Sequence, residues 1–202
     1  MAESKEPELF DALDHRGERI GHKMTRRRIL DSGYARNVVH VWLVNSPEQL
    51  VIQQRAEKGS GLWDNRWDVS VGGGNTAGEE PQRSAARELK EELGLTEEAV
   101  YPSLRLVPGK FDGRWNTSKP MPDMNNRMAY EFSYTFLLRQ SVELSELTVQ
   151  PEEVAAIKTI SLKNLARQVH HPEQYKKWVP HPREYYLGVI AAIHAMEKHE
   201  SA

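Results

Sequence analysis

The segment from residue 72 to residue 95 constrains the fold more than any other part of this 202-residue chain. Three consecutive glycines follow a strand-like stretch at residues 67–71, Pro81 suits the first turn of a helix, and Gly94 suits its end. These signals predict a strand, a glycine loop and a helix in close succession. Strands and helices elsewhere interleave without a strict repeat, which predicts an α/β fold with a mixed β-sheet between α-helices.

Two sets of side chains repeat along the predicted helix. An apolar stripe recurs every four residues, at Ala85, Leu89 and Leu93. Offsets of three and four place three carboxylates in one arc beside that stripe, namely Glu88, Glu91 and Glu92. Taken alone, such a run of glutamates is usually a solvated face. The surrounding pattern decides between a solvated face and a ligand cluster.

That pattern spans 23 residues and resembles the Nudix box at every fixed position. The matching residues are Gly73, Glu79, Arg87-Glu88-Leu89, Glu91-Glu92 and Gly94-Leu95. The resemblance implies a Nudix fold and an enzyme that hydrolyses a diphosphate linkage. It also implies metal ligation by Glu88, Glu91 and Glu92, with the Gly73 carbonyl joining them and Arg87 orienting a glutamate. Oxygen ligands without His or Cys suit Mg²⁺ or Mn²⁺.

Phrases outside the box resemble the isopentenyl-diphosphate-isomerase-like branch of this family. They are Leu9-Phe10-Asp11, His40-Val41-Trp42-Leu43, Gln53-Gln54-Arg55-Ala56 and Trp67-Asp68. An isomerase of this fold uses a cysteine before the box and metal-binding histidines, but this chain has no cysteine. Gly72 stands at the cysteine position, and Gly74 and Arg36 stand where histidines are expected. We therefore expect hydrolysis, with the isomerase and a non-catalytic nucleotide-sensing module as alternatives.

The general base stays open among three carboxylates. Glu131 matches a glutamate at the active centre of the isomerase-like branch, and its alternative is an edge-strand surface carboxylate. Glu153 precedes a predicted strand where Nudix enzymes often recruit a carboxylate, and its alternative is a solvent-facing charge. Glu88 is the third candidate.

The substrate is expected to be a nucleoside diphosphate derivative or an isoprenyl diphosphate. The resemblance implies that Arg55 and Lys58 hold its distal phosphate. Trp115 is a candidate to stack on a nucleobase or cover a prenyl chain. A basic run at residues 26–28 is more often a solvated face. His170, His171 and His181 lack ligand spacing, so we expect structural or surface roles for them.

The remaining sequence predicts one domain over residues 1–202, with an N-terminal hairpin extension at about 8–30 and a C-terminal helix at about 182–199. Strands are expected at residues 38–44, 50–54, 104–107, 130–138 and 154–160, with a loop-like insertion at 108–127. A formal net charge of -2 provides no field for nucleic acid or an anionic membrane. We expect a cytoplasmic monomer or homodimer without a membrane span.

Overall fold

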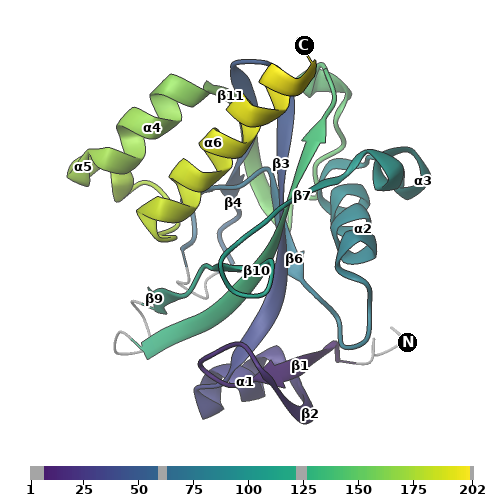
Figure 1. Ribbon diagram of the computed structural model, residues 1–202, viewed down its shortest axis with the longest axis vertical. Coiled ribbons are helices and arrows are strands. Elements are labelled where there is room, and N and C mark those ends of the chain that lie inside the picture. Colours follow the sequence, from purple (N-terminus) through teal and green to yellow (C-terminus); the bar gives the residue numbers. More distant parts are fainter. Residues whose placement is uncertain (1–6, 59–62, 122–126, 201–202) are drawn as a thin grey trace.

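The computed structural model describes residues 7–58, 63–121 and 127–200 (Figure 1). Its strands are β1 (Leu9–Leu13), β2 (Arg19–Thr25), β3 (Ala35–Ser46), β4 (Gln49–Arg55), β5 (Trp67–Asp68), β6 (Val71–Gly74), β7 (Arg105–Val107), β8 (Trp115–Asn116), β9 (Lys119–Met121), β10 (Arg127–Arg139) and β11 (Val154–Ser161). Its α-helices are α1 (Arg26–Ser32), α2 (Pro81–Leu93), α3 (Glu97–Val100), α4 (Leu162–His170), α5 (Pro172–Tyr175) and α6 (Arg183–Glu200). None of the described helices is both long enough and apolar enough to span a bilayer.

The strands form a mixed sheet, as predicted. Its central pair, β3 and β10, is parallel and runs through the height of the molecule (Figure 1). One path through the sheet has the order β11, β4, β3, β1, β2, while β7, β8 and β9 pair with β10 and β6 pairs with β3. All of these other pairs are antiparallel.

Helices cover both faces of the sheet, with α4 and α6 on one side and α2 and α3 on the other (Figure 1). The alternation of side chains along β3 explains this arrangement. Trp42 and Val44 pack into the core that includes α4 and α6. Val39, Val41 and Leu43 pack into the core that includes α2. A strand that is apolar on both faces therefore holds the two helical layers together.

The bounds of α2 follow its sequence signals. Pro81 occupies the first turn, where its missing N–H costs no hydrogen bond. Gly94 ends the helix in the left-handed conformation at φ 73°, and its N–H bonds to the carbonyls of Leu89 and Lys90. The predicted stripe of Ala85, Leu89 and Leu93 is fully buried. The three glutamates consequently lie at the edge of the core.

Local predictions near the site need three corrections. The predicted glycine loop is wrong, because residues 72–74 belong to β6 and pair with Val38, Val39 and His40 of β3. The hairpin extension ends at Thr25, whose hydroxyl caps α1, so residues 26–30 are helical. The insertion at 108–127 contains the short strands β8 and β9, and its residues 122–126 lie outside the described residues.

Candidate active site

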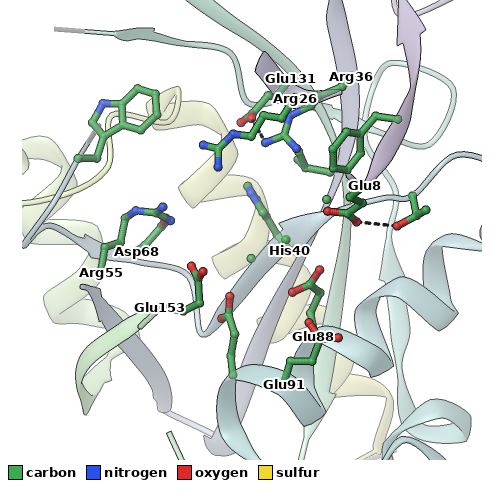
Figure 2. A pocket seen from close by; sticks show the side chains of 18 of the residues that line it. Glu8, Arg26, Arg36, His40, Arg55, Asp68, Glu88, Glu91, Glu131 and Glu153 are labelled. Atoms are coloured by element: carbon green, nitrogen blue, oxygen red, sulfur yellow. Dashed lines mark hydrogen bonds and ion pairs between the residues drawn. The ribbon is translucent and has the colours of Figure 1, made fainter. Parts of the chain in front are cut away.

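A cavity of about 760 Å³ opens between β3, β6 and α2. Figure 2 shows two charged sides. Glu88, Glu91 and Glu153 lie on one, and Arg26 and Arg36 lie opposite. The structure brings nine of the ten predicted site residues to this cavity: Arg55, Lys58, Gly73, Arg87, Glu88, Glu91, Glu92, Glu131 and Glu153. Opposed acidic and basic surfaces suit a polyanion that is bound together with a cation.

Glu88 and Glu92 are buried in the acidic side, at 8% and 4% exposure. Burial raises the pKa of Glu88 to about 7, and it raises the pKa of Glu92 well above its ordinary value. Each carboxylate also faces a neighbouring acid, which adds to the shift. Such a pair keeps both charges at neutral pH only when a cation compensates them.

Gly73 permits the position of Glu88. A Cβ atom built on Gly73 would overlap the carboxyl group of Glu88, so any larger residue there requires Glu88 to move. The carboxylate therefore lies against the backbone of β6. This close approach explains why a glycine stands here although its backbone is ordinary strand.

Arg87 links the acids of the box. Its Nη1 lies 2.9 Å from Glu88 Oε1 and 3.4 Å from Glu91 Oε2. Its Nη2 lies 3.3 Å from Glu79 and donates to the carbonyl of Gly74 at 3.3 Å. Arg87 therefore contacts three glutamates of the box, and its orienting role stays a prediction.

The donor groups on the acidic side of the cavity decide which metal ion it can hold. Among the described residues, no three His, Asp or Glu side chains converge as a formed metal centre, and Arg87 lies between Glu88 and Glu91. The available donors are nevertheless carboxylate oxygens, which hard divalent cations prefer. Two of those carboxylates are buried next to like charges, so the residues fit a divalent cation.

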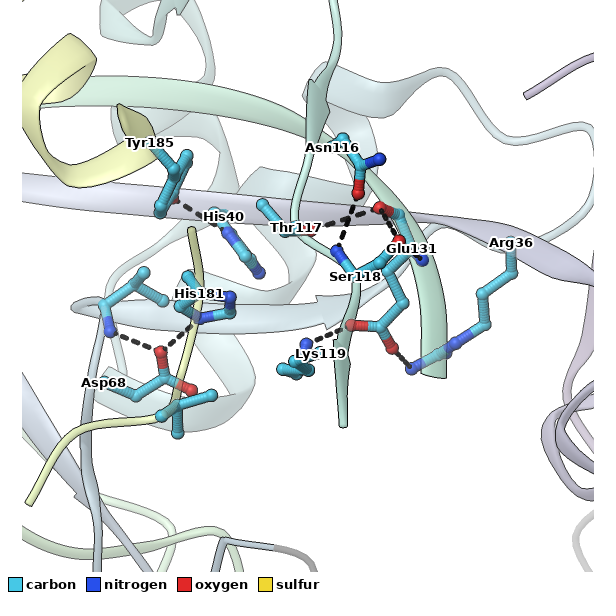
Figure 3. A network of polar contacts seen from close by, with 12 residues as sticks. Arg36, His40, Asp68, Asn116, Thr117, Ser118, Lys119, Glu131, His181 and Tyr185 are labelled. Carbon is cyan, nitrogen blue, oxygen red and sulfur yellow. Dashed lines mark hydrogen bonds and ion pairs between the residues drawn. The ribbon is translucent and has the colours of Figure 1, made fainter. Parts of the chain in front are cut away.

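Glu131 lies on the opposite side of the cavity, buried between two cations (Figure 3). Arg36 Nη2 donates to Glu131 Oε1 at 2.8 Å, and Lys119 pairs with Oε2. Although burial raises its pKa, Lys119 and Arg36 together hold the pKa of Glu131 well below its usual range. The edge-strand alternative is wrong, because β3 pairs with Glu131 on one side and Thr117 and Ser118 bond to its backbone on the other. A carboxylate with both oxygens engaged is a poor proton acceptor.

Glu153 and the two predicted phosphate-binding cations meet at the mouth of the cavity. Glu153 forms an ion pair with Lys58, and both side chains are more than a third exposed. Arg55 Nη1 lies 3.5 Å from Asp68 Oδ2, and its Nε is buried without a hydrogen-bond partner among the described residues. Of the two cations, Lys58 is paired with Glu153, whereas the guanidinium of Arg55 retains a buried N–H that can bind an anion.

Trp115 is absent from the cavity. Its ring packs where a Cβ on Gly188 would stand, and it contacts Tyr185 edge-on at 5.9 Å between centroids. Its Nε1 donates to the carbonyl of Val107 at 3.1 Å. The prediction of substrate contact fails because the insertion folds against α6, and this packing leaves no signal in the local sequence.

Several residues that line the cavity were missed or misjudged from the sequence. They are Arg26, Arg27, His40, Asp68, Lys119 and His181. Arg26 stands close enough to Arg36 that this neighbouring cation lowers its pKa to about 10, so the basic run at 26–28 is not purely a solvated face. His181 is 1% exposed, which contradicts a surface role. Two signals for His40 were available in the sequence: the phrase at residues 40–43 that resembles the isomerase-like branch, and the alternation of β3, which puts His40 on the same face as Arg36.

Comparisons with known proteins agree with this geometry. The chain matches the NUDIX domain over residues 33–181. It is 32% identical over 166 residues to an uncharacterized Nudix hydrolase of Listeria innocua, covering 78% of this chain and 82% of that protein. It is 29% identical over 156 residues to an isopentenyl-diphosphate Delta-isomerase of Dinoroseobacter shibae, covering 73% of this chain and 76% of the relative.

Among solved structures, the crystal structure of DR0079 from Deinococcus radiodurans has 25% sequence identity and a TM-score of 0.60. The similarity covers 81% of this chain and 89% of that one. The domain match alone extends over most of the chain and includes the whole acidic box. The chain belongs to the Nudix family and is a hydrolase with relatives in the isopentenyl-diphosphate-isomerase-like branch.

Proposed function

We propose that this enzyme uses Mg²⁺ or Mn²⁺ to hydrolyse a diphosphate linkage in a nucleoside diphosphate derivative or an isoprenyl diphosphate. The observation that carries the proposal is one cavity with the glutamates of α2 on one side and arginines on the other (Figure 2). A diphosphate needs its negative charges neutralised before water can attack phosphorus. The two sides of the cavity provide this neutralisation from opposite directions.

Glu88, Glu91 and Glu92, together with the carbonyl of Gly73, would hold the cation. When bound, a divalent cation withdraws electron density from phosphoryl oxygens and lowers the pKa of water. Arg87 keeps Glu88 and Glu91 oriented through its ion pairs. The buried Glu88 and Glu92 would then both be ionised at neutral pH, because the cation offsets their mutual repulsion.

Water attack forms one phosphorus–oxygen bond and breaks the bond from phosphorus to the bridging oxygen, which leaves with the electron pair. The water proton passes to a carboxylate. We assign this role to Glu153, since it lines the cavity, is 38% exposed in its side chain and is outside the metal set. Glu131 is occupied by Arg36 and Lys119, and Glu88 is assigned to the metal.

Arg55 would bind the distal phosphate through its buried Nε, which none of the described residues pairs with, and Arg26 would be a second cation. Lys58 contributes once the substrate draws it away from Glu153. The partners of the protein would be small molecules, because a net charge of -2 does not favour binding to a nucleic-acid backbone. The enzyme would act in the cytoplasm as a monomer or homodimer.

The test incubates the protein with Mg²⁺ and a panel of nucleoside diphosphates, nucleotide sugars, dinucleotides and isoprenyl diphosphates, and quantifies released products. Turnover supports the hydrolase, whereas binding without turnover supports a sensing module. Glu92→Gln should lower turnover by at least roughly a hundredfold. The exposed Glu98→Gln on α3 is the matched control and should retain full turnover.

The Glu153→Gln variant distinguishes a general base from a metal ligand. It should lower kcat while leaving the Mg²⁺ concentration for half-maximal rate unchanged, whereas Glu92→Gln should raise that concentration. A Glu153→Gln enzyme with normal kcat would remove Glu153 from the mechanism. Isopentenyl diphosphate in heavy water should yield no deuterated allylic product, since the chain has no cysteine.

A further inference from the structure

Several buried nitrogens around the cavity have no hydrogen-bond partner within the described part of the chain. They are Arg36 Nε, Arg55 Nε, Trp63 Nε1 and His181 Nδ1. Trp63 also adopts a φ of 62°, a strained backbone conformation for a bulky residue. Buried polar atoms are normally paired, so unpaired ones around one cavity indicate contacts that a ligand completes. Three of these atoms are donors, and His181 Nδ1 belongs to a ring that can also accept.

The contacts of His181 fix which of its nitrogens carries hydrogen. Its Nε2 lies 2.9 Å from Asp68 Oδ1, which also accepts from the N–H of Val69 (Figure 3). Although burial raises its pKa, His181 and Arg55 hold the pKa of Asp68 below its ordinary value, so this carboxylate is an acceptor only. Burial lowers the pKa of His181, which keeps the ring neutral. Nε2 therefore holds the hydrogen, and the lone pair of Nδ1 is not bonded by any residue that the structure describes.

His40 has the complementary arrangement. Its Nδ1 lies 2.8 Å from the hydroxyl of Tyr185, and Trp42 Nε1 donates to that same hydroxyl at 3.0 Å. The indole of Trp42 can only donate, and the Thr135 hydroxyl that also bonds to Tyr185 is able to donate, so the hydrogen of the Tyr185 hydroxyl can go to His40 Nδ1. Burial lowers the pKa of His40 well below its ordinary value, so Nε2 carries the one hydrogen of a neutral ring.

The His40 ring is part of the cavity wall. Figure 2 shows the His40 ring at the back of the cavity, between the carboxylates and the arginines. The side chain is directed past Gly72, where an added Cβ would lie 3.9 Å from Nε2. The His40 and His181 rings meet edge-on with centroids 5.0 Å apart. Both rings line the cavity, so the donor of His40 and the acceptor of His181 belong to neighbouring rings of its wall.

We propose that His40 and His181 form a hydrogen-bonding subsite for a hydroxyl group on the organic part of the substrate. A hydroxyl both donates and accepts, so it can satisfy His181 Nδ1 and His40 Nε2 together. The inference rests on the proposed hydrolysis of a diphosphate ester. It narrows the substrates to diphosphate esters whose organic part carries a hydroxyl group, as in a sugar. Asp68 and Tyr185 are positioning residues that hold the two rings in the required hydrogen-bonding states.

An isoprenyl chain fits this arrangement poorly. It would cover both histidines while offering no polar atom, and a site built to bond a hydroxyl rejects analogues that lack it by large factors. The apolar side chains of the cavity, such as Phe10, Val38 and Val179, are interspersed with charged groups. The polar subsite therefore favours a sugar-linked diphosphate over an isoprenyl diphosphate.

The test uses variants that retain one contact of each ring. His181→Gln places an amide nitrogen near the former Nε2 and keeps the Asp68 contact while removing Nδ1. His40→Asn places an oxygen near the former Nδ1 and keeps the Tyr185 contact while removing Nε2–H. The ligands are ADP, ADP-ribose, 2′,3′-dideoxy-ADP and geranyl diphosphate, with affinity measured by calorimetry without Mg²⁺ so that no turnover intervenes.

The wild-type protein should bind ADP or ADP-ribose at least tenfold more tightly than dideoxy-ADP and geranyl diphosphate. Each variant should lose that preference while keeping its affinity for dideoxy-ADP. Equal affinity for all ligands in the wild type, or an equal loss for all in the variants, would overturn the subsite. The Mg²⁺ turnover assay reports separately on hydrolysis, so a protein that discriminates hydroxyls without cleaving any ligand would contradict only the proposed function.

Discussion

The carboxyl group of Glu88 occupies the space that a side chain on Gly73 would fill. The two residues are joined through packing of α2 on β6, and this contact fixes a box glutamate against the strand that pairs with β3. Because the overlapping atoms belong to a side chain rather than to backbone, the conflict in a larger variant is relieved by moving Glu88. A larger residue at position 73 should therefore displace Glu88 on the acidic side of the cavity without disrupting the fold.

Gly73→Ala should consequently separate activity from stability. We expect turnover to fall by at least tenfold, since a displaced Glu88 no longer faces Glu92 and Arg87 in the same way. The thermal unfolding midpoint should change little, because a flexible side chain absorbs the clash. Steady-state kinetics and calorimetric unfolding of the same preparation measure both. Normal turnover would show that the position of Glu88 does not matter.

Glu131→Gln should destabilise the protein strongly. The substitution leaves Arg36 and Lys119 buried without their counter-ion, at 9% and 7% side-chain exposure. Breaking a buried ion pair in this way costs about 3–5 kcal/mol. Urea unfolding measures the loss, with Glu173→Gln at the exposed pair with Lys176 as the control that should leave the midpoint nearly unchanged. A loss as small as that of the control would mean that the cations find other partners.

Trp115→Phe should lower stability without changing substrate affinity. The variant loses the hydrogen bond to Val107 and part of the packing on Gly188. We expect the free energy of unfolding to fall by about 0.5–3 kcal/mol. KM for the best substrate of the panel should stay within twofold of the wild type. A large rise in KM with unchanged stability would return Trp115 to the substrate site.

Stability should decline as the pH falls through the range of histidine titration. Burial lowers the pKa of His40 and of His181 in the folded state, while unfolded histidines titrate near 6.5. Below that pH the unfolded chain binds protons that the folded chain excludes. The contribution of these rings to stability is therefore complete above about pH 6.5 and is lost as the pH falls.

Urea midpoints of the wild type and of the His40→Asn/His181→Gln double variant, measured from pH 8 to pH 5, test this expectation. The wild type should lose stability more steeply, by up to about 1.4 kcal/mol per pH unit for each histidine. The raised pKa values of Glu88 and Glu92 act in the opposite direction in both proteins, so the comparison isolates the histidines. Parallel pH profiles would show that the rings are protonated in the folded state.

Features that depend on neighbouring residues could be predicted from the amino-acid sequence. Pro81 and Gly94 bound α2 because one fixes φ at a helix start and the other adopts the left-handed conformation at its end. The helical period then places Glu88, Glu91 and Glu92 at one edge of the core. The interleaving of predicted strands and helices without a strict repeat likewise predicted a mixed sheet between helices.

Which distant groups meet and which charges are buried depends on how the whole chain packs. Asp68 and His181 bond across 113 residues, and Arg36 and Glu131 across 95. Glu131 changed from a candidate base to a paired structural acid because a strand of the insertion brought Lys119 beside it. Ionisation and hydrogen-bonding state depend on burial and on contacts remote in sequence. The local periodicity of the sequence predicts neither of these states, so the polar subsite could be identified only from the folded structure.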